Sequence, residues 1–224
     1  APQNKGLMLA LMAIFIALLT AIIPIELENH EHIMTAAFAA EALLLFWAGF
    51  RLKLTDLRTY AAIIQGIALV SWFICIDSFL VNSTVLINSF VGLTIFVIAL
   101  MGAISYLYQK NKNHLGKSEK DIPGILMVLM NLMGVFILSH QASHYFDLMK
   151  TNNAAFSNRD ANQATQVSLS VIWVLYAISL LVVGIAKQIK SIRFLGLALF
   201  GVTIFKVFFV DLGELPTEYR IIAF

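Results

Sequence analysis

The chain has 224 residues, 60% of them apolar and 12% charged, with a formal net charge of +2 and a mean hydropathy of +0.85. A composition this apolar excludes an ordinary soluble domain. The apolar residues form runs of about 20 residues, the length that one α-helix needs to cross a bilayer, whereas the strands of a membrane β-barrel have about ten residues of alternating polarity.

Seven such runs predict seven membrane spans and an all-α fold, a polytopic transmembrane helical bundle. In chain order the predicted spans are residues 6–25, 33–50, 58–76, 86–108, 124–142, 168–186 and 192–211. Residues from about Glu218 onward resemble the first turns of an eighth span. The sequence shows no convincing internal repeat, so it lacks the repeated halves that are typical of many transporters.

Two of the predicted connections are longer than a turn. Residues 109–123 form a basic, flexible linker, and Pro123 at its end suits the first turn of the next helix. Residues 147–167 form a polar loop rich in Asn, Ala, Thr and Gln. We therefore predict a four-helix membrane subdomain, 1–108, the cytoplasmic basic linker, 109–123, and a three-helix membrane subdomain with the start of a further helix, 124–224.

Basic residues gather on alternate connections and predict the orientation of the chain. One set comprises Lys5, Arg51, Lys53, Arg58, Lys110, Lys112, Lys117, Lys120, Lys187, Lys190 and Arg193. A cytoplasmic N-terminus places this whole set inside, and leaves Lys150, Arg159 and Arg220 outside, as the positive-inside rule requires. Because topology accounts for these clusters, they need no nucleic-acid partner.

The orientation predicts which connections a membrane-impermeant thiol reagent reaches in intact spheroplasts. In a background without Cys75, a cysteine introduced at Ser157 is expected to react, and one at Ser118 is expected to stay unlabelled until the membrane is opened. Labelling at Ser118 but not at Ser157 would reverse the assigned topology.

Two charged residues lie well inside predicted spans, Glu41 in the second and Lys206 in the last. A charge at membrane depth costs about 2.5–3.5 kcal/mol on insertion scales, so it normally has a partner or a task. At about 1.5 Å per residue the two lie at similar depth in the outer half of the bilayer, and we predict an intramembrane charge pair. The pair is interpreted as a structural clamp or as a proton- or ion-linked transport site. The remaining alternative is a Lys206 that reaches the outer surface above a protonated Glu41.

Four histidines lie near the predicted outer face. His30 and His32 belong to an acidic loop, and His140 and His144 share one face of the fifth predicted span. An i, i+4 pair of imidazoles with further ligands from a loop is a pattern that zinc or copper sites use. The alternative interpretation is a water-exposed acidic turn and two histidines at the membrane interface.

The C-terminal stretch from Val167 resembles a bacterial membrane-protein family known as domain of unknown function 2339. The residues that carry the resemblance are Ser170, Trp173, Arg193, Gly196, Lys206, Asp211 and Arg220. Earlier residues that are similar to the family's pattern are Glu41, Trp47, Gly49, Arg51 and the segment Ser143 to Phe146. His140 departs from it, because family members often carry a glutamate there. The resemblance implies a helical membrane protein and no particular activity.

The function expected from the sequence is that of an integral, multi-pass protein of a bacterial inner membrane. The sequence has no Gly-x-Ser-x-Gly motif and no phosphate loop, so nothing in it indicates an enzyme. We expect a structural or accessory subunit whose partners are the lipid bilayer and other membrane proteins or further copies of itself, and we predict no cofactor. The alternatives are a proton- or ion-coupled transporter or channel using Glu41 and Lys206, and a metal-dependent activity at the outer face.

Overall fold

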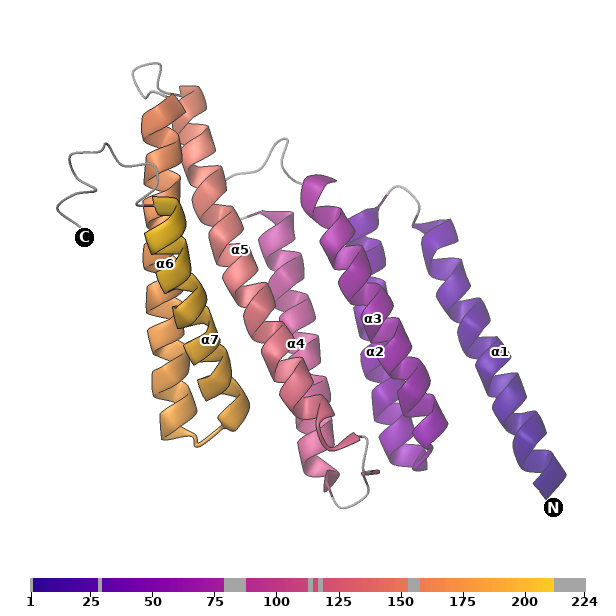
Figure 1. Ribbon diagram of the computed structural model, residues 1–224. Helices are drawn as coiled ribbons and strands as arrows, with labels where there is room; N and C mark the ends of the chain where they lie inside the picture. The colour runs from indigo at the N-terminus through magenta and orange to yellow at the C-terminus, as the bar shows by residue number, and fades with distance from the viewer. Residues whose placement is uncertain are drawn as a thin grey trace. The chain divides into compact units, whose positions relative to one another are not determined.

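The computed structural model describes the backbone of residues 2–27, 30–78, 88–112, 115–116, 119–152 and 158–211 (Figure 1). Within these ranges the structure describes the backbone but not the side chains of residues 2–10, 12–13, 77–78, 152, 158–160 and 211. The predicted start of an eighth span and Arg220 lie outside the described residues.

Seven α-helices follow one another within the described ranges. They are α1 (Pro2–Glu26), α2 (Glu31–Leu52), α3 (Thr55–Ser78), α4 (Ser89–Lys110), α5 (Ile122–Asn152), α6 (Asn158–Ala186) and α7 (Lys190–Lys206), and α7 continues as a π-helical turn, Val207–Asp211. Six of them, α2 to α7, are long and apolar enough in their described residues to cross a membrane, and α1 contains a shorter apolar helical stretch, Ile14–Glu26. The predicted all-α, polytopic membrane fold is confirmed.

The predicted loop 147–167 is the element on which sequence and structure differ most. Helix α5 continues through 147–152, and α6 begins at Asn158. The prediction ended each span where hydropathy falls. Neither 143–152 nor 158–167 contains glycine or proline, so no residue stops these helices after their side chains become polar.

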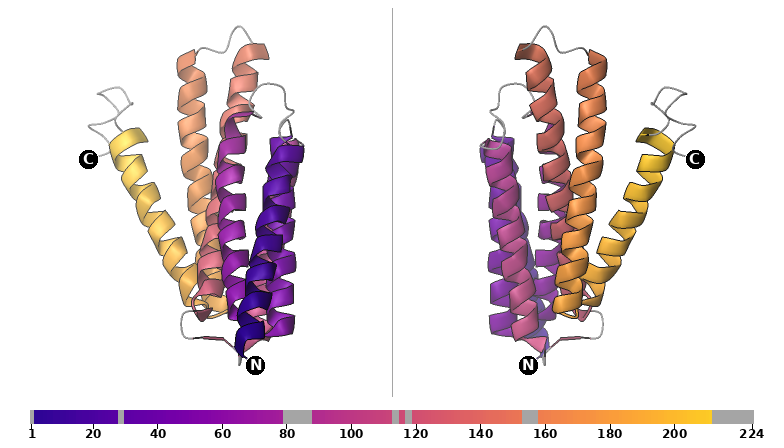
Figure 2. Two further views of the ribbon diagram at one scale, coloured as in Figure 1. Left: turned by 90° about the vertical axis from the view of Figure 1, so that its right-hand side faces the viewer. Right: turned by 90° about the vertical axis from the view of Figure 1, so that its left-hand side faces the viewer.

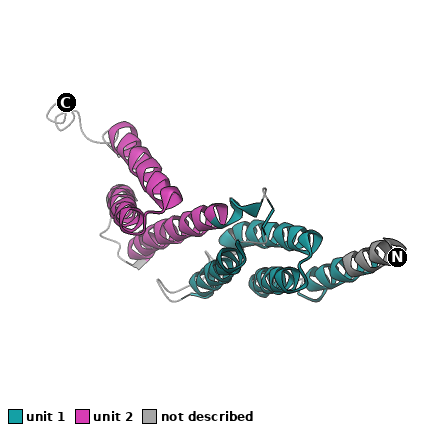
Figure 3. Cartoon of the chain, turned by 90° about the horizontal axis from the view of Figure 1, so that it is seen from below, with its two compact units in different colours: residues 1–123 teal, residues 124–224 magenta. Residues whose placement is uncertain are grey.

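The chain divides into two compact units, residues 1–123 and residues 124–224 (Figure 3). In the first unit α2 packs against both α3 and α4. Its core contains Phe46, Phe90, Val97, Met101 and Ile104, all 2% exposed or less. In the second unit α6 and α7 are joined by a short turn, from which they diverge toward their other ends (Figure 2), and the two helices pack against each other.

The hairpins α2–α3 and α6–α7 are closed by the same backbone turn. Lys53 and Gln188 both take the left-handed conformation, with φ of 55° and 54°. In each turn the N–H of the next residue donates to a glycine carbonyl: Leu54 to Gly49 and Ile189 to Gly184, each at 3.0 Å. This is the hydrogen bond of a Schellman motif, which ends a helix and reverses the chain.

The two hairpins also match at the close approach of their helices. A Cβ added to Gly49 would lie 2.7 Å from Arg58 Cγ, and one added to Gly184 would lie 2.7 Å from Arg193 Cγ. The glycine and the arginine have the same spacing in both hairpins. The chain therefore contains a repeated helical hairpin, which the sequence analysis missed because the repeat preserves positions more than residue types.

Candidate functional site

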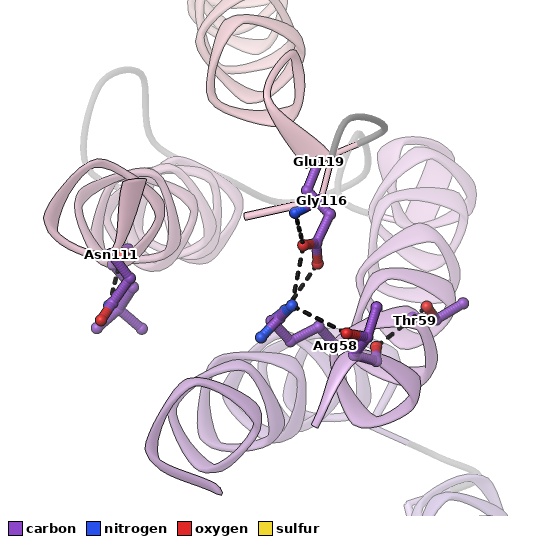
Figure 4. A network of polar contacts seen from close by, with 7 residues as sticks. Arg58, Thr59, Asn111, Gly116 and Glu119 are labelled. Atoms are coloured by element: carbon purple, nitrogen blue, oxygen red, sulfur yellow. Dashed lines mark hydrogen bonds and ion pairs between the residues drawn. The ribbon is translucent and has the colours of Figure 1, made fainter. Parts of the chain in front are cut away.

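A buried ion pair joins α3 to the connection between α4 and α5. Arg58 Nε donates to Glu119 Oε1 at 2.7 Å, and Arg58 Nη2 donates to Oε2 at 2.9 Å (Figure 4). The two side chains are 5% and 11% exposed. Such a bidentate arginine–carboxylate pair is among the stronger polar contacts of proteins and also fixes the orientation of both groups.

Neighbouring residues contact both Arg58 and Glu119 and help to hold them in place. The guanidinium of Arg58 lies 5.1 Å from the centroid of the Phe50 ring, and its Nη2 also donates to Thr55 Oγ1 at 3.2 Å. On the other side, the N–H of Gly116 donates to Glu119 Oε2 at 3.0 Å. Since each charge has several partners, the pair holds part of the 109–123 connection on the end of α3.

The protonation behaviour of Glu119 follows from these contacts. Burial acts to raise the pKa of Glu119, but the hydrogen bonds from Arg58 and Gly116 and the charge of Arg58 together outweigh it, so the pKa lies below its usual value. Sequence reasoning missed this site because Arg58 was assigned to a topological cluster. A lone glutamate between the lysines of a basic linker was the available signal.

Lys206 lies in the second unit and bonds to α6. Its Nζ donates to Ser170 Oγ at 2.8 Å and to the Gln166 carbonyl oxygen at 3.0 Å. Ser170 Oγ in turn donates to the same carbonyl at 3.2 Å. The ammonium group of Lys206 thus cross-links α7 to the neighbouring helix.

The first hairpin carries a neutral version of this contact. Thr35 and Ser71 share a hydrogen bond of 2.6 Å, and they are separated by 36 residues, as are Ser170 and Lys206. Thr35 Oγ1 donates to the carbonyl oxygen four residues back, as Ser170 Oγ does. The same interhelical position therefore holds a hydroxyl pair in one hairpin and a hydroxyl–ammonium pair in the other.

Glu41 lies in the middle of α2 and faces α1. Its Oε1 accepts a hydrogen bond from Thr20 Oγ1 at 2.8 Å, while its buried Oε2 has no hydrogen-bond partner among the described residues. Glu41 is 8% exposed. It lines an apolar groove of about 440 Å³ between α1 and α2, together with residues that include Leu11, Phe15, Leu19, Leu44 and Ala48.

The Glu41–Lys206 pair stays a prediction, because its two members belong to different compact units. It is tested by the variants Glu41→Gln and Lys206→Met, alone and combined, with stability read from unfolding in detergent. A formed pair predicts that the double variant is more stable than the sum of single effects implies, by about 1 kcal/mol, since a surviving charge loses its partner. Strictly additive effects would show that each residue is satisfied within its own unit.

The predicted metal ligands lie in two places. The rings of His30 and His32 are 6.1 Å apart in the first unit, and those of His140 and His144 stack at 6.4 Å in the second. Among the described residues no group of three His, Cys, Asp or Glu side chains is arranged to hold a metal ion. The zinc or copper site at His30, His32, His140 and His144 thus remains untested as a four-residue cluster.

Two further polar contacts join α5 to α6. Trp173 Nε1 donates to Ser139 Oγ at 2.8 Å, and Tyr176 donates its hydroxyl to Asn131 Oδ1 at 3.1 Å. Along α6, Ser170 therefore hydrogen-bonds to α7, whereas Trp173 and Tyr176 hydrogen-bond to α5. Three of the residues that carried the family resemblance, Ser170, Trp173 and Lys206, are interhelical contact residues of this unit.

A family model described as "Predicted membrane protein (DUF2339)" matches residues 5–224, nearly the whole chain and not only its C-terminal stretch. No curated protein and no solved structure matches the chain.

Proposed function

Because the chain belongs to the DUF2339 family of predicted membrane proteins, we propose that it is a structural subunit of a membrane assembly, built into a bacterial inner membrane with its N-terminus in the cytoplasm. The observation that carries this proposal is the pair of hydrogen bonds that the Lys206 ammonium donates to α6. Lys206 bonds to a hydroxyl and a backbone carbonyl of α6, and so it ties α7 to its neighbour in the hairpin.

Several other polar contacts support a scaffold. Trp72 Nε1 donates to Thr94 Oγ1 at 2.9 Å between α3 and α4, and Arg58 fixes the following connection through Glu119. In a bilayer, where lipid tails are as apolar as leucine, interhelical hydrogen bonds and close packing hold helices together. These contacts order the helices without requiring a substrate.

A second candidate function, proton- or ion-coupled transport, is favoured by one observation. Glu41 Oε2 is buried, has no described hydrogen-bond partner, and belongs to a residue that lines the groove between α1 and α2. A buried carboxyl oxygen with no described partner, on the wall of a groove, is where a transported proton or cation would bind.

The two functions are separated by reconstituting the purified full-length protein in liposomes. A scaffold gives proton and cation fluxes equal to those of empty liposomes, and Lys206→Met lowers its stability and dissociates its assembly in native membranes. Lys150→Met, at an exposed position near the end of α5, is the matched control. A flux that Glu41→Gln abolishes in a folded protein would favour transport and contradict the scaffold role.

A further inference from the structure

Arg193 holds the position in the second hairpin that Arg58 holds in the first. Both arginines follow a turn residue in the left-handed conformation. In both, Cγ lies close to a helical glycine, 2.7 Å from where a Cβ on that glycine would be. Arg58 uses this position to present its guanidinium to a carboxylate. The turn and the contact with the glycine therefore give Arg193 the same place in its hairpin that Arg58 has in the first.

The surroundings of Arg193 differ from those of Arg58 in where the charges lie. Near Arg58 the first hairpin has Arg51, Lys53 and the acid Asp56, whereas near Arg193 the second has Lys187 and Lys190, both exposed, and no acid between Gly184 and Arg193. Lys190 and Arg193 are three residues apart on α7 and so share one helix face. Among the described residues no carboxylate forms an ion pair with Arg193, which is half-buried.

We propose that Arg193, with Lys187 and Lys190, binds the phosphate of an anionic phospholipid, in the position that Glu119 occupies on Arg58. Arginine binds phosphate oxygens with the same two-pronged geometry that it uses for carboxylates. Three cations exceed what one carboxylate neutralises. They lie at the end of two predicted spans, and basic clusters at that level bind the headgroups of anionic lipids. This inference is independent of the scaffold role.

Arginine reactivity tests the proposal in the full chain. The protein is reconstituted in nanodiscs of phosphatidylcholine alone or with phosphatidylglycerol, treated with phenylglyoxal, and mapped by mass spectrometry. We expect phosphatidylglycerol to slow modification of Arg193 about tenfold. A tenfold change corresponds to a free-energy difference of about 1.4 kcal/mol. The variant Lys187→Gln, Lys190→Gln is expected to lose most of this protection while its helical content is unchanged.

Two other arginines calibrate the experiment. Arg51 is exposed and is expected to react in every lipid, whereas Arg58 is expected to stay protected in every lipid and to become reactive in Glu119→Gln. Equal reactivity of Arg193 in both lipids would overturn the proposal. If Arg193 is equally protected, it is covered by a group that both membranes share, either a protein carboxylate or the phosphatidylcholine phosphate, and not by an anionic lipid. If it is equally exposed, no anion binds. Protection by inorganic phosphate in phosphatidylcholine, without any protection by phosphatidylglycerol, would assign the site to a free anion and exclude the lipid source.

Discussion

Replacing Glu119 by glutamine is expected to destabilise the protein by about 3–5 kcal/mol, because the substitution leaves the buried guanidinium of Arg58 without a counter-charge. The loss concerns two hydrogen bonds of 2.7 and 2.9 Å to Arg58. Gly116 also contributes, since its N–H bonds to the same carboxylate. The measurement is the free energy of unfolding in mixed micelles.

A second substitution separates the pair from its individual charges. The double variant Arg58→Met, Glu119→Gln is expected to recover much of the loss, since no unpaired buried charge remains. Asp121→Asn, an exposed acid in the same connection, is the control and is expected to change stability by less than about 0.5 kcal/mol. If Glu119→Gln has no larger effect than Asp121→Asn, the buried pair does not hold the connection.

The same pair predicts a dependence of stability on pH. The pKa of Glu119 is lower in the folded protein than in the unfolded chain, so its contribution is complete above the unfolded value of about 4.3 and is lost as pH falls through the folded pKa. The difference in stability between the wild-type protein and Glu119→Gln should therefore shrink below about pH 4.3. A difference that stays constant as the solution is acidified would show that Glu119 is not ionised in the folded protein.

The substitution Gly184→Ala is expected to cost about 1–3 kcal/mol by forcing α6 and α7 apart at their turn. The added Cβ would lie 2.8 Å from the backbone nitrogen of Arg193 and 3.2 Å from its Cα. Backbone atoms this close cannot move away as the end of a flexible side chain does. The loss is measured as the change in unfolding free energy in detergent.

Gly201→Ala is the matched control, because a Cβ at this position of α7 meets nothing within 4 Å. Alanine is the better helix former by about 1 kcal/mol, so this variant is expected to be as stable as the wild type or more so. If Gly184→Ala is stabilising to the same degree, the close approach of α6 and α7 does not limit the hairpin.

The fold follows largely from hydropathy and charge placement, whereas the candidate site does not. Runs of apolar residues located the seven helices of the described part of the chain, because a bilayer imposes both the length and the composition of a spanning segment. The Arg58–Glu119 pair joins residues 61 positions apart, and its formation depends on how the chain returns after α4. No local sequence pattern predicts where the chain after α4 meets α3.

The resemblance to a family identified residues without their contacts. It named Ser170 and Lys206, but their hydrogen bond appears only once α6 and α7 are packed as a hairpin. The match with Thr35 and Ser71 was hidden for a similar reason, since a serine and a lysine at equivalent positions look unrelated in sequence. The prediction of Glu41 and Lys206 as membrane-depth residues was made from composition, and their pairing remains for the double-variant experiment.

The length of α5 and α6 has a consequence for how far the protein stands out of the membrane. At about 1.5 Å per residue, helices of 31 and 29 residues measure roughly 45 Å, whereas the hydrocarbon layer is about 30 Å thick. A tilt of about 20° absorbs only a few ångströms of that excess. The residues around Lys150 and Ala161 therefore stand beyond the lipid tails as a short, rigid helical stalk. A stalk of this kind offers an antibody or a soluble protein a fixed point of attachment above the lipid headgroups.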